Sequence, residues 1–189
     1  MELSNLREQF QSDEYRDNRY KTWWNSWEWS YWDNAIYKAE FINKFVKENN
    51  IIFAIEVWCW DWNNLWMYDI HNYTWYDVSE KAIEICKEMY KYDFNKDFIV
   101  NDDNTEFKKA ELSMCIDMIY HVFPRAKREK MIDKIIEAWT KYVIFYTPIN
   151  LKARTENSCM NDYDFIEYIE SKWLRYEIEK TNPPASIAK

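Results

Sequence analysis

Apolar residues recur in two different rhythms along the 189-residue chain. Over residues 35–48 the apolar positions step by three or four, which is the spacing of one buried face on an amphipathic helix. The run 51–55 that follows is short, continuous and rich in β-branched residues, as expected of a strand covered on both faces. The sequence therefore predicts a helix followed by a buried strand.

Strand and helix signals alternate after this point. Further strands are predicted over 73–77, 97–100, 112–116 and 142–146, with an edge strand over 174–179, where apolar and polar residues alternate. Helices are predicted after Ser79, which is a good N-cap, and over 127–139 and 162–172. The apolar face of the helix after Ser79 is expected to carry Ile83, Cys86, Met89 and Tyr90. This alternation predicts an α/β fold, with a mostly parallel central sheet flanked by helices.

Composition narrows the class of protein. The length suits one domain, and 25 basic against 33 acidic residues give a net charge of -8, which disfavours nucleic acid as a partner. The four cysteines form no C-x-x-C pair, and Cys59, Cys86 and Cys115 lie in apolar runs as expected of buried thiols. No signal peptide or membrane span is visible, so we expect a cytoplasmic protein.

The strongest anomaly is the absence of glycine beside 12 tryptophans. Average usage of about 7% would supply roughly 13 glycines, close to the number of tryptophans. The tryptophans cluster where glycine is expected, at Trp23, Trp24, Trp27, Trp29 and Trp32 and at Trp58, Trp60, Trp62 and Trp66. We infer that tryptophan stands at glycine positions, and one hypothesis is a UGA stop codon that is reassigned to glycine and has been read as tryptophan.

The second tryptophan cluster directly follows the predicted strand 51–55. Residues 55–65 read I-E-V-W-C-W-D-W-N-N-L, and with glycine at 58, 60 and 62 they become I-E-V-G-C-G-D-G-N-N-L. That string resembles the nucleotide-binding loop of class I S-adenosylmethionine-dependent methyltransferases. Such a loop turns sharply and brings its backbone close to the cofactor, and both need a residue without Cβ. The resemblance implies a Rossmann-like methyltransferase fold with S-adenosylmethionine as cofactor.

The resemblance extends along the chain and implies roles for single residues. Glu56 would help to hold the methionine end of the cofactor, and the Asp77 carboxylate would accept hydrogen bonds from both ribose hydroxyls. Asp102 follows the third strand, where relatives contact adenine. The implied cofactor-binding set is Glu56, Val57, Trp58, Cys59, Trp60, Trp62, Asp77, Val78, Asp102, Cys115 and Ile116.

Residues 110–121 are similar to the family's fourth strand and its exit loop, which lines the cleft. The resemblance places Asp117, Tyr120 and His121 near the methyl acceptor, with His121 at the mouth. If a base is needed, His121 has the most suitable intrinsic pKa. No metal is implied, the acceptor would be a small molecule or a glycan, and the oligomeric state is left open.

The N-terminal and C-terminal parts of the chain also bear on the family resemblance. Residues 20–32, read with glycines, resemble the N-terminal cap of a bacterial and viral methyltransferase subgroup, so we divide the chain into a lead and cap over 1–34 and an α/β domain over 35–189. Residues 142–146 match the family's fifth strand. Relatives finish with an antiparallel strand pair, of which only 174–179 is visible, so the C-terminal strand is expected to be missing.

Several of these residues have structural alternatives. Trp58, Trp60 and Trp62 have the period of two of a strand. His121 is also typical of a structural histidine after an apolar strand. The carboxylates have alternatives too: a solvated strand-end charge for Glu56, a helix cap near Ser79 for Asp77, a solvated turn for Asp102 and backbone hydrogen bonds for Asp117.

The sequence thus favours a methyltransferase that transfers a sulfonium methyl group to an oxygen, nitrogen or carbon nucleophile, mainly by holding the two in line. If the loop tryptophans are real, indoles would fill the cofactor's place, and an inactive binding or scaffold protein of the same fold is the alternative. A module that stacks sugars or bases on the 23–32 tryptophans fits the acidic chain poorly.

Overall fold

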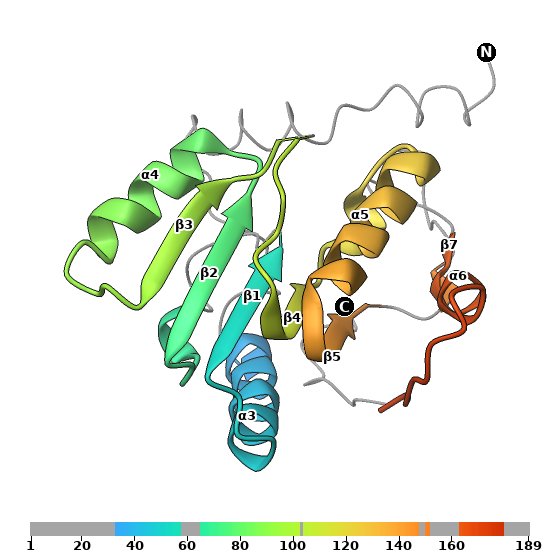
Figure 1. Cartoon of the computed structure of the whole chain (residues 1–189), viewed down its shortest axis with the longest axis horizontal. Coiled ribbons are helices and arrows are strands. Elements are labelled where there is room, and N and C mark those ends of the chain that lie inside the picture. Colours follow the sequence, from blue (N-terminus) through green and yellow to red (C-terminus); the bar gives the residue numbers. More distant parts are fainter. Residues whose placement is uncertain (1–32, 58–64, 103, 148–149, 152–162, 180–189) are drawn as a thin grey trace.

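A parallel sheet forms the centre of the molecule (Figure 1). The computed structural model describes residues 33–57, 65–102, 104–147, 150–151 and 163–179. The sheet has five strands in the order β3-β2-β1-β4-β5, and every neighbouring pair is parallel. The strands are β1 (Phe53–Val57), β2 (Asn72–Asp77), β3 (Lys96–Val100), β4 (Ala110–Ile116) and β5 (Trp139–Tyr146). The predicted α/β fold is therefore confirmed.

Helices cover both faces of this sheet. Apolar side chains of α3 (Asp33–Glu48) and α4 (Glu80–Met89) form one buried cluster with the sheet, and those of α5 (Arg125–Ala138) and the short α6 (Phe165–Glu170) form the other. Neighbouring residues of β1 divide between the clusters, Ala54 into the first and Ile55 into the second, as the alternation of a strand requires. Both layers must be present for the sheet to be buried.

Smaller elements complete the described chain. They are the 3-10 turns η2 (Leu65–Met67) and η3 (Ile119–His121) and an antiparallel pair made of β6 (Asn150–Leu151) and β7 (Tyr163–Asp164). None of the described helices is both long and apolar enough to cross a membrane. The lead and cap predicted over 1–34 lie almost entirely outside the described residues, so this boundary stays a prediction.

The first strand begins two residues later than predicted, at Phe53. The reason is the end of α3, where Asn50 takes a left-handed φ of 50°. The N–H of Ile51 donates to the carbonyl of Val46 at 3.0 Å, and the N–H of Asn50 donates to that of Lys47 at 3.4 Å. This is the double closure of a Schellman cap. Ile51 is thus buried by the helix end and not by strand pairing.

The helix α4 confirms its predicted cap. The Ser79 Oγ accepts a hydrogen bond from the N–H of Ala82 at 3.3 Å. Cys86 is buried in its apolar face and, like Cys115, has a buried thiol, as expected. The prediction was wrong for Met89, which is 55% exposed. Ala82 lies on the buried face instead, together with Ile83 and Cys86, and Met89 is the last residue of the helix.

The C-terminal predictions were only partly right. The helix predicted over 162–172 is reduced to α6, and residues 174–179 form no strand. In the described part of the chain no strand lies beside them, and Tyr176 and Ile178 are exposed. Tyr176 instead donates its hydroxyl to Glu170 Oε1 at 2.6 Å. In the described part of the chain, β5 pairs with β4 alone.

Trp173 has a backbone conformation that favours glycine. Its φ is 58°, it follows the last turn of α6, and its side chain is 95% exposed, so no packing offsets the left-handed strain. We expect Trp173→Gly to raise the free energy of unfolding by about 1 kcal/mol in urea denaturation. The control is Trp139→Gly at a φ of -72°, which should destabilise the protein. Equal losses in both variants would contradict the account.

Glu111 of β4 forms hydrogen bonds to β5 and to the start of β1, near the end of the sheet where β4 and β1 begin. It accepts a charged hydrogen bond from Lys141 on β5, and its Oε2 accepts the N–H groups of Ile52 at 2.7 Å and Phe53 at 3.2 Å. The Lys141 ammonium, followed by these two N–H groups, lowers the pKa of Glu111 from 4.5 to about 2. The ionised form is therefore favoured by folding.

Because the folded pKa is depressed, the stabilisation by Glu111 is complete above pH 4.5 and is lost as pH falls toward 2. We expect Glu111→Gln to lower the free energy of unfolding by about 1 kcal/mol at pH 7 and by less at pH 3. Urea denaturation at the two pH values measures this, with the exposed Glu177→Gln as control. An equal loss at both pH values would refute the linkage.

Candidate functional site

Polar side chains lie at, or directly after, the carboxyl ends of four neighbouring strands. Glu56 lies near the end of β1, Asp77 ends β2, Asn101 follows β3 and Asp117 follows β4. Because the strands are parallel, these ends meet at one edge of the sheet. The chain order reverses between β1 and β4, and the crevice outside such a switch point is the usual ligand site of open α/β sheets. The predicted residues Glu56, Asp77 and Asp117 are thus brought to one edge.

Glu56 is held inside the protein and is not a solvated strand-end charge. It is 1% exposed, and its Oε2 accepts a hydrogen bond from the hydroxyl of Tyr73 on the neighbouring strand β2. A buried carboxylate is costly unless it is hydrogen-bonded. The solvated alternative for Glu56 is therefore wrong, while its contact with a cofactor stays a prediction.

Asp77 takes part in the cap that was its structural alternative. Its side chain is fully buried, and Oδ1 accepts the N–H of Ser79, the N-cap residue of α4, at 2.9 Å. A carboxylate has about four lone-pair sites, so this bond leaves acceptor capacity for further donors. The cap therefore fixes the orientation of Asp77 while engaging only part of the acceptor capacity of its carboxylate. Val78 lies half-buried between these two residues.

The two polar residues after β3 differ in exposure, and Asp102 lies in the solvated turn that was its structural alternative. Asp102 is exposed, and its Oδ1 accepts the Thr105 hydroxyl at 2.7 Å and the N–H of Asn104 at 2.9 Å. The Thr105 hydroxyl, followed by that N–H, lowers the pKa of Asp102. Asn101 is the buried one, at 5% exposure, and its N–H donates to the Asp77 carbonyl at 2.7 Å. The adenine role of Asp102 stays a prediction.

At the end of β4 the chain turns sharply. Asp117 has a φ of 55°, and its N–H donates to the Tyr146 carbonyl at the end of β5 at 2.9 Å. Cys115 and Ile116 are both buried, in the clusters on opposite faces of the sheet. Since only a short side chain such as Asp tolerates the left-handed region well, the sequence suits this turn.

A lysine that sequence reasoning missed completes this corner. Lys38 of α3 is 3% exposed, and its Nζ lies 2.8 Å from Asp117 Oδ2. Burial raises the pKa of Asp117, while the Lys38 ammonium and a hydrogen bond from Tyr120 act against that rise. A signal was available, because Lys38 lies three residues after Ala35 and four before Ile42, on the buried face of α3.

Tyr120 and His121 lie together in η3. Both are 8% exposed, and their rings pack with centroids 4.3 Å apart. The N–H of His121 donates to the Met118 carbonyl at 2.9 Å. Tyr120 is close to Asp117, to which it donates a hydrogen bond. His121 is mostly buried and does not lie open at the mouth of a cleft. The remaining predicted residues, Trp58, Cys59, Trp60 and Trp62, lie outside the described residues.

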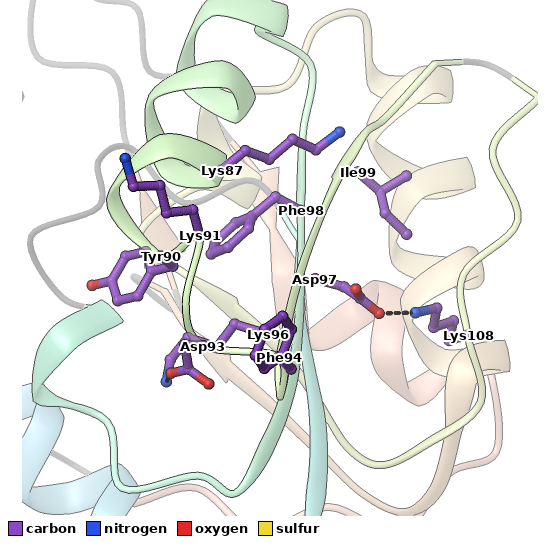
Figure 2. Close-up of a pocket in the computed structure, with 10 residues that line it drawn as sticks. All are labelled: Lys87, Tyr90, Lys91, Asp93, Phe94, Lys96, Asp97, Phe98, Ile99 and Lys108. Carbon is purple, nitrogen blue, oxygen red and sulfur yellow. Dashed lines mark hydrogen bonds and ion pairs between the residues drawn. The ribbon is translucent and has the colours of Figure 1, made fainter.

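A shallow hollow of about 430 Å³ lies elsewhere, along the outer side of β3 and the α4–β3 turn (Figure 2). Two of its lysines are paired with acids that also line it, Lys96 with Asp93 and Lys108 with Asp97. Lys96 and Asp97 begin β3, whereas the carboxylates described above gather where the strands end. The hollow therefore contains none of the polar residues Glu56, Asp77, Asn101 and Asp117 at the carboxyl ends of the strands, which we call the carboxyl edge.

Comparison with solved structures identifies the architecture. No protein-family model and no curated protein matches the sequence. N-methyltransferase NodS from Bradyrhizobium japonicum WM9, solved with S-adenosyl-L-homocysteine, superposes with a TM-score of 0.60 at 10% identity, over 72% of this chain and 72% of that one. Magnesium protoporphyrin IX methyltransferase (ChlM) from Synechocystis PCC 6803, also with S-adenosylhomocysteine bound, gives 0.50 at 15% identity, over 76% and 71%.

This is the methyltransferase fold. At such low identity the likeness concerns the fold, and function must be argued from the site. In a methyltransferase fold with the strand order seen here, the residues to consider are those at the carboxyl edge, around the β1–β4 switch point. The predicted Rossmann-like architecture is therefore confirmed.

Proposed function

We propose that this protein is an S-adenosylmethionine-dependent methyltransferase. The observation that carries the proposal is the row of carboxylates at three neighbouring strand ends around the switch point, where Glu56 and Asp77 are buried and Asp117 is 16% exposed. Both structural neighbours named above are methyltransferases solved with S-adenosylhomocysteine. S-adenosylmethionine, when bound, supplies an electrophilic sulfonium methyl group.

The described residues suit a ligand that has a sugar and an amino-acid end. Asp77, oriented by Ser79, offers carboxylate lone pairs to ribose hydroxyls. Glu56, fixed by Tyr73, offers a negative charge near the methionine end. Val57, Val78, Cys115 and Ile116 would line the site, with Asp102 toward adenine. Tyr120 and His121 would lie on the acceptor side with Asp117.

The acceptor proposed is a small molecule or a glycan, and the compartment is the cytoplasm. The names of the two structural neighbours imply different acceptors, so the fold alone does not select one. Within the lead and cap over 1–34, residues 20–32 are proposed to act as a cap over the site, which would exclude water during transfer.

Glycine in the loop is part of the proposal. The left-handed Trp173 supports it, since glycine is the usual residue at such a helix end. The printed indoles at 58, 60 and 62 favour the second candidate, an inactive scaffold of the same fold. The coding DNA separates the two origins, because the hypothesis requires UGA at all twelve tryptophan codons.

The test is ligand selectivity in a variant with glycine at 58, 60 and 62, which we call the glycine-loop variant. Equilibrium dialysis should show binding of labelled S-adenosylmethionine that S-adenosylhomocysteine displaces. NAD⁺ and ATP, which other folds of this kind bind, should not compete. Binding of NAD⁺ or ATP in preference, or of none of these ligands, would overturn the proposed function.

A further inference from the structure

The corner where α3 meets the end of β4 contains a buried ion pair that the predicted site did not include. Lys38 Nζ lies 2.8 Å from Asp117 Oδ2, and the two side chains are 3% and 16% exposed. Placing two charges out of water costs several kcal/mol per ion, which their attraction often only matches. Stability alone is therefore a poor reason for this pair to be present.

The location of the pair gives a better reason. Asp117 is the first residue after β4, at the switch point beside β1, and its left-handed φ of 55° turns the chain there. The lysine comes from 79 positions earlier in the chain, so α3 and the β4 exit loop must both be in place for the pair to form. The carboxylate is the more exposed partner, and the ammonium lies behind it.

Two charged or polar side chains act on the Asp117 carboxyl from elements that the structure describes. Lys38 approaches from α3, and Tyr120 from η3 donates a hydrogen bond. At the end of β5, the backbone carbonyl of Tyr146 accepts the Asp117 N–H. His121 packs on the Tyr120 ring, one step farther away. Among these groups, Lys38 alone carries a permanent positive charge at neutral pH.

We propose that Lys38 is the positioning residue for Asp117 and holds that carboxylate ionised and fixed at the switch point. The role of this pair in methyl transfer rests on the proposed function. A fixed, ionised carboxylate accepts a hydrogen bond from an N–H or O–H group, so the pair suits an amine or hydroxyl as methyl acceptor. Asn34, one turn earlier on the same face of α3, adds a buried Oδ1 acceptor that has no hydrogen-bond partner in the described chain.

The test follows the ionisation of Asp117 directly in the full-length protein. Carboxyl carbons are titrated by ¹³C NMR, and the Asp117 signal is assigned by its loss in Asp117→Asn. We expect Lys38→Met to raise the titration midpoint of Asp117 by about one to three pH units. Lys38→Arg should restore most of the original midpoint, since it keeps the charge.

A matched control removes a lysine from a different ion pair. Lys172 Nζ lies 2.7 Å from Asp133 Oδ1 between α6 and α5, and Lys172→Met should leave the Asp117 midpoint unchanged. An unchanged midpoint in folded Lys38→Met would overturn the proposal. The titration needs no cofactor, so its failure is distinct from a failure to bind S-adenosylmethionine.

A second measurement covers a Lys38→Met variant that is too unstable for the titration. Removing one partner leaves a buried unpaired charge, whereas removing both charges relieves it. The double variant Lys38→Met, Asp117→Asn should therefore melt at a higher temperature than Lys38→Met alone. A double variant that melts no higher would show that the two residues are not coupled and would overturn the inference.

Discussion

Replacing Trp58, Trp60 and Trp62 by glycine is expected to convert a chain with no measurable affinity for S-adenosylhomocysteine into one with a dissociation constant of about micromolar magnitude. The resemblance places these three positions in a loop that must turn tightly against the cofactor. An indole adds a large volume at each point and strains the backbone wherever φ is positive. Isothermal titration calorimetry on both chains measures the change, and about 1 μM corresponds to about -8 kcal/mol.

The control substitutes tryptophans away from that loop. Trp66 is 65% and Trp173 95% exposed, and changing both to glycine removes two indoles without touching positions 58, 60 or 62. This control should remain without measurable affinity. If the printed chain binds as tightly as the glycine-loop variant, the inference that glycine belongs at these positions is wrong.

The second large effect concerns Asp77. In the glycine-loop variant, Asp77→Ala should weaken S-adenosylhomocysteine binding about 10- to 100-fold, because a hydrogen bond to a charged group is worth about 1.5–3 kcal/mol. Asp77 is fully buried and oriented by the N–H of Ser79, so few of its rotamers compete with the binding geometry. Calorimetry at pH 7 gives the ratio of dissociation constants.

Asp97 provides the matched control for this experiment. It is also an aspartate of the sheet, but it lies near the start of β3, pairs with Lys108 and is 61% exposed. Asp97→Ala should leave the affinity within about twofold, since surface ion pairs contribute little. Equal losses in the two variants would mean that the Asp77 effect is not local to the site.

The sequence predicted the sheet better than the site. Each of the strands β1 to β5 was predicted at nearly its observed place, because buried parallel strands are short apolar runs. The start of β1 was missed, since Ile51 is apolar for a different reason: it closes the Schellman cap of α3. The strand predicted over 174–179 was wrong, because alternation indicates a strand only when a partner strand is present, and the described residues contain none beside it.

Within the candidate site, the sequence indicated which residues lie at strand ends, but it did not indicate which residues contact them. Glu56, Asp77 and Asp117 could be predicted because the family resemblance assigns roles to the residues at the ends of three predicted strands. The partners that orient them, Tyr73 and Lys38, come from other elements, and a single sequence does not show which distant residues meet. Lys38 on the apolar face of a helix was nevertheless a visible signal of a buried charge.

Two described tryptophans bear on the glycine inference in different ways. Trp173 has the left-handed φ that favours glycine. Trp75, a β2 position to which that inference also assigns glycine, is 1% exposed and packs edge-on against Phe98, with ring centroids 6.0 Å apart. Its Nε1 donor has no hydrogen-bond partner among the described residues, and a buried unpaired donor costs about 1–3 kcal/mol. An indole at position 75 therefore packs well and satisfies its polar atom poorly.

The most direct measurement of the central claim is hydrogen exchange of the glycine-loop variant with and without S-adenosylhomocysteine. The account predicts slower exchange at the carboxyl ends of β1, β2 and β4, around Glu56, Asp77 and Asp117, and no change along the hollow beside β3. Protection confined to that hollow, or no protection at any strand end when the ligand is saturating, would contradict a methyltransferase site at this edge of the sheet.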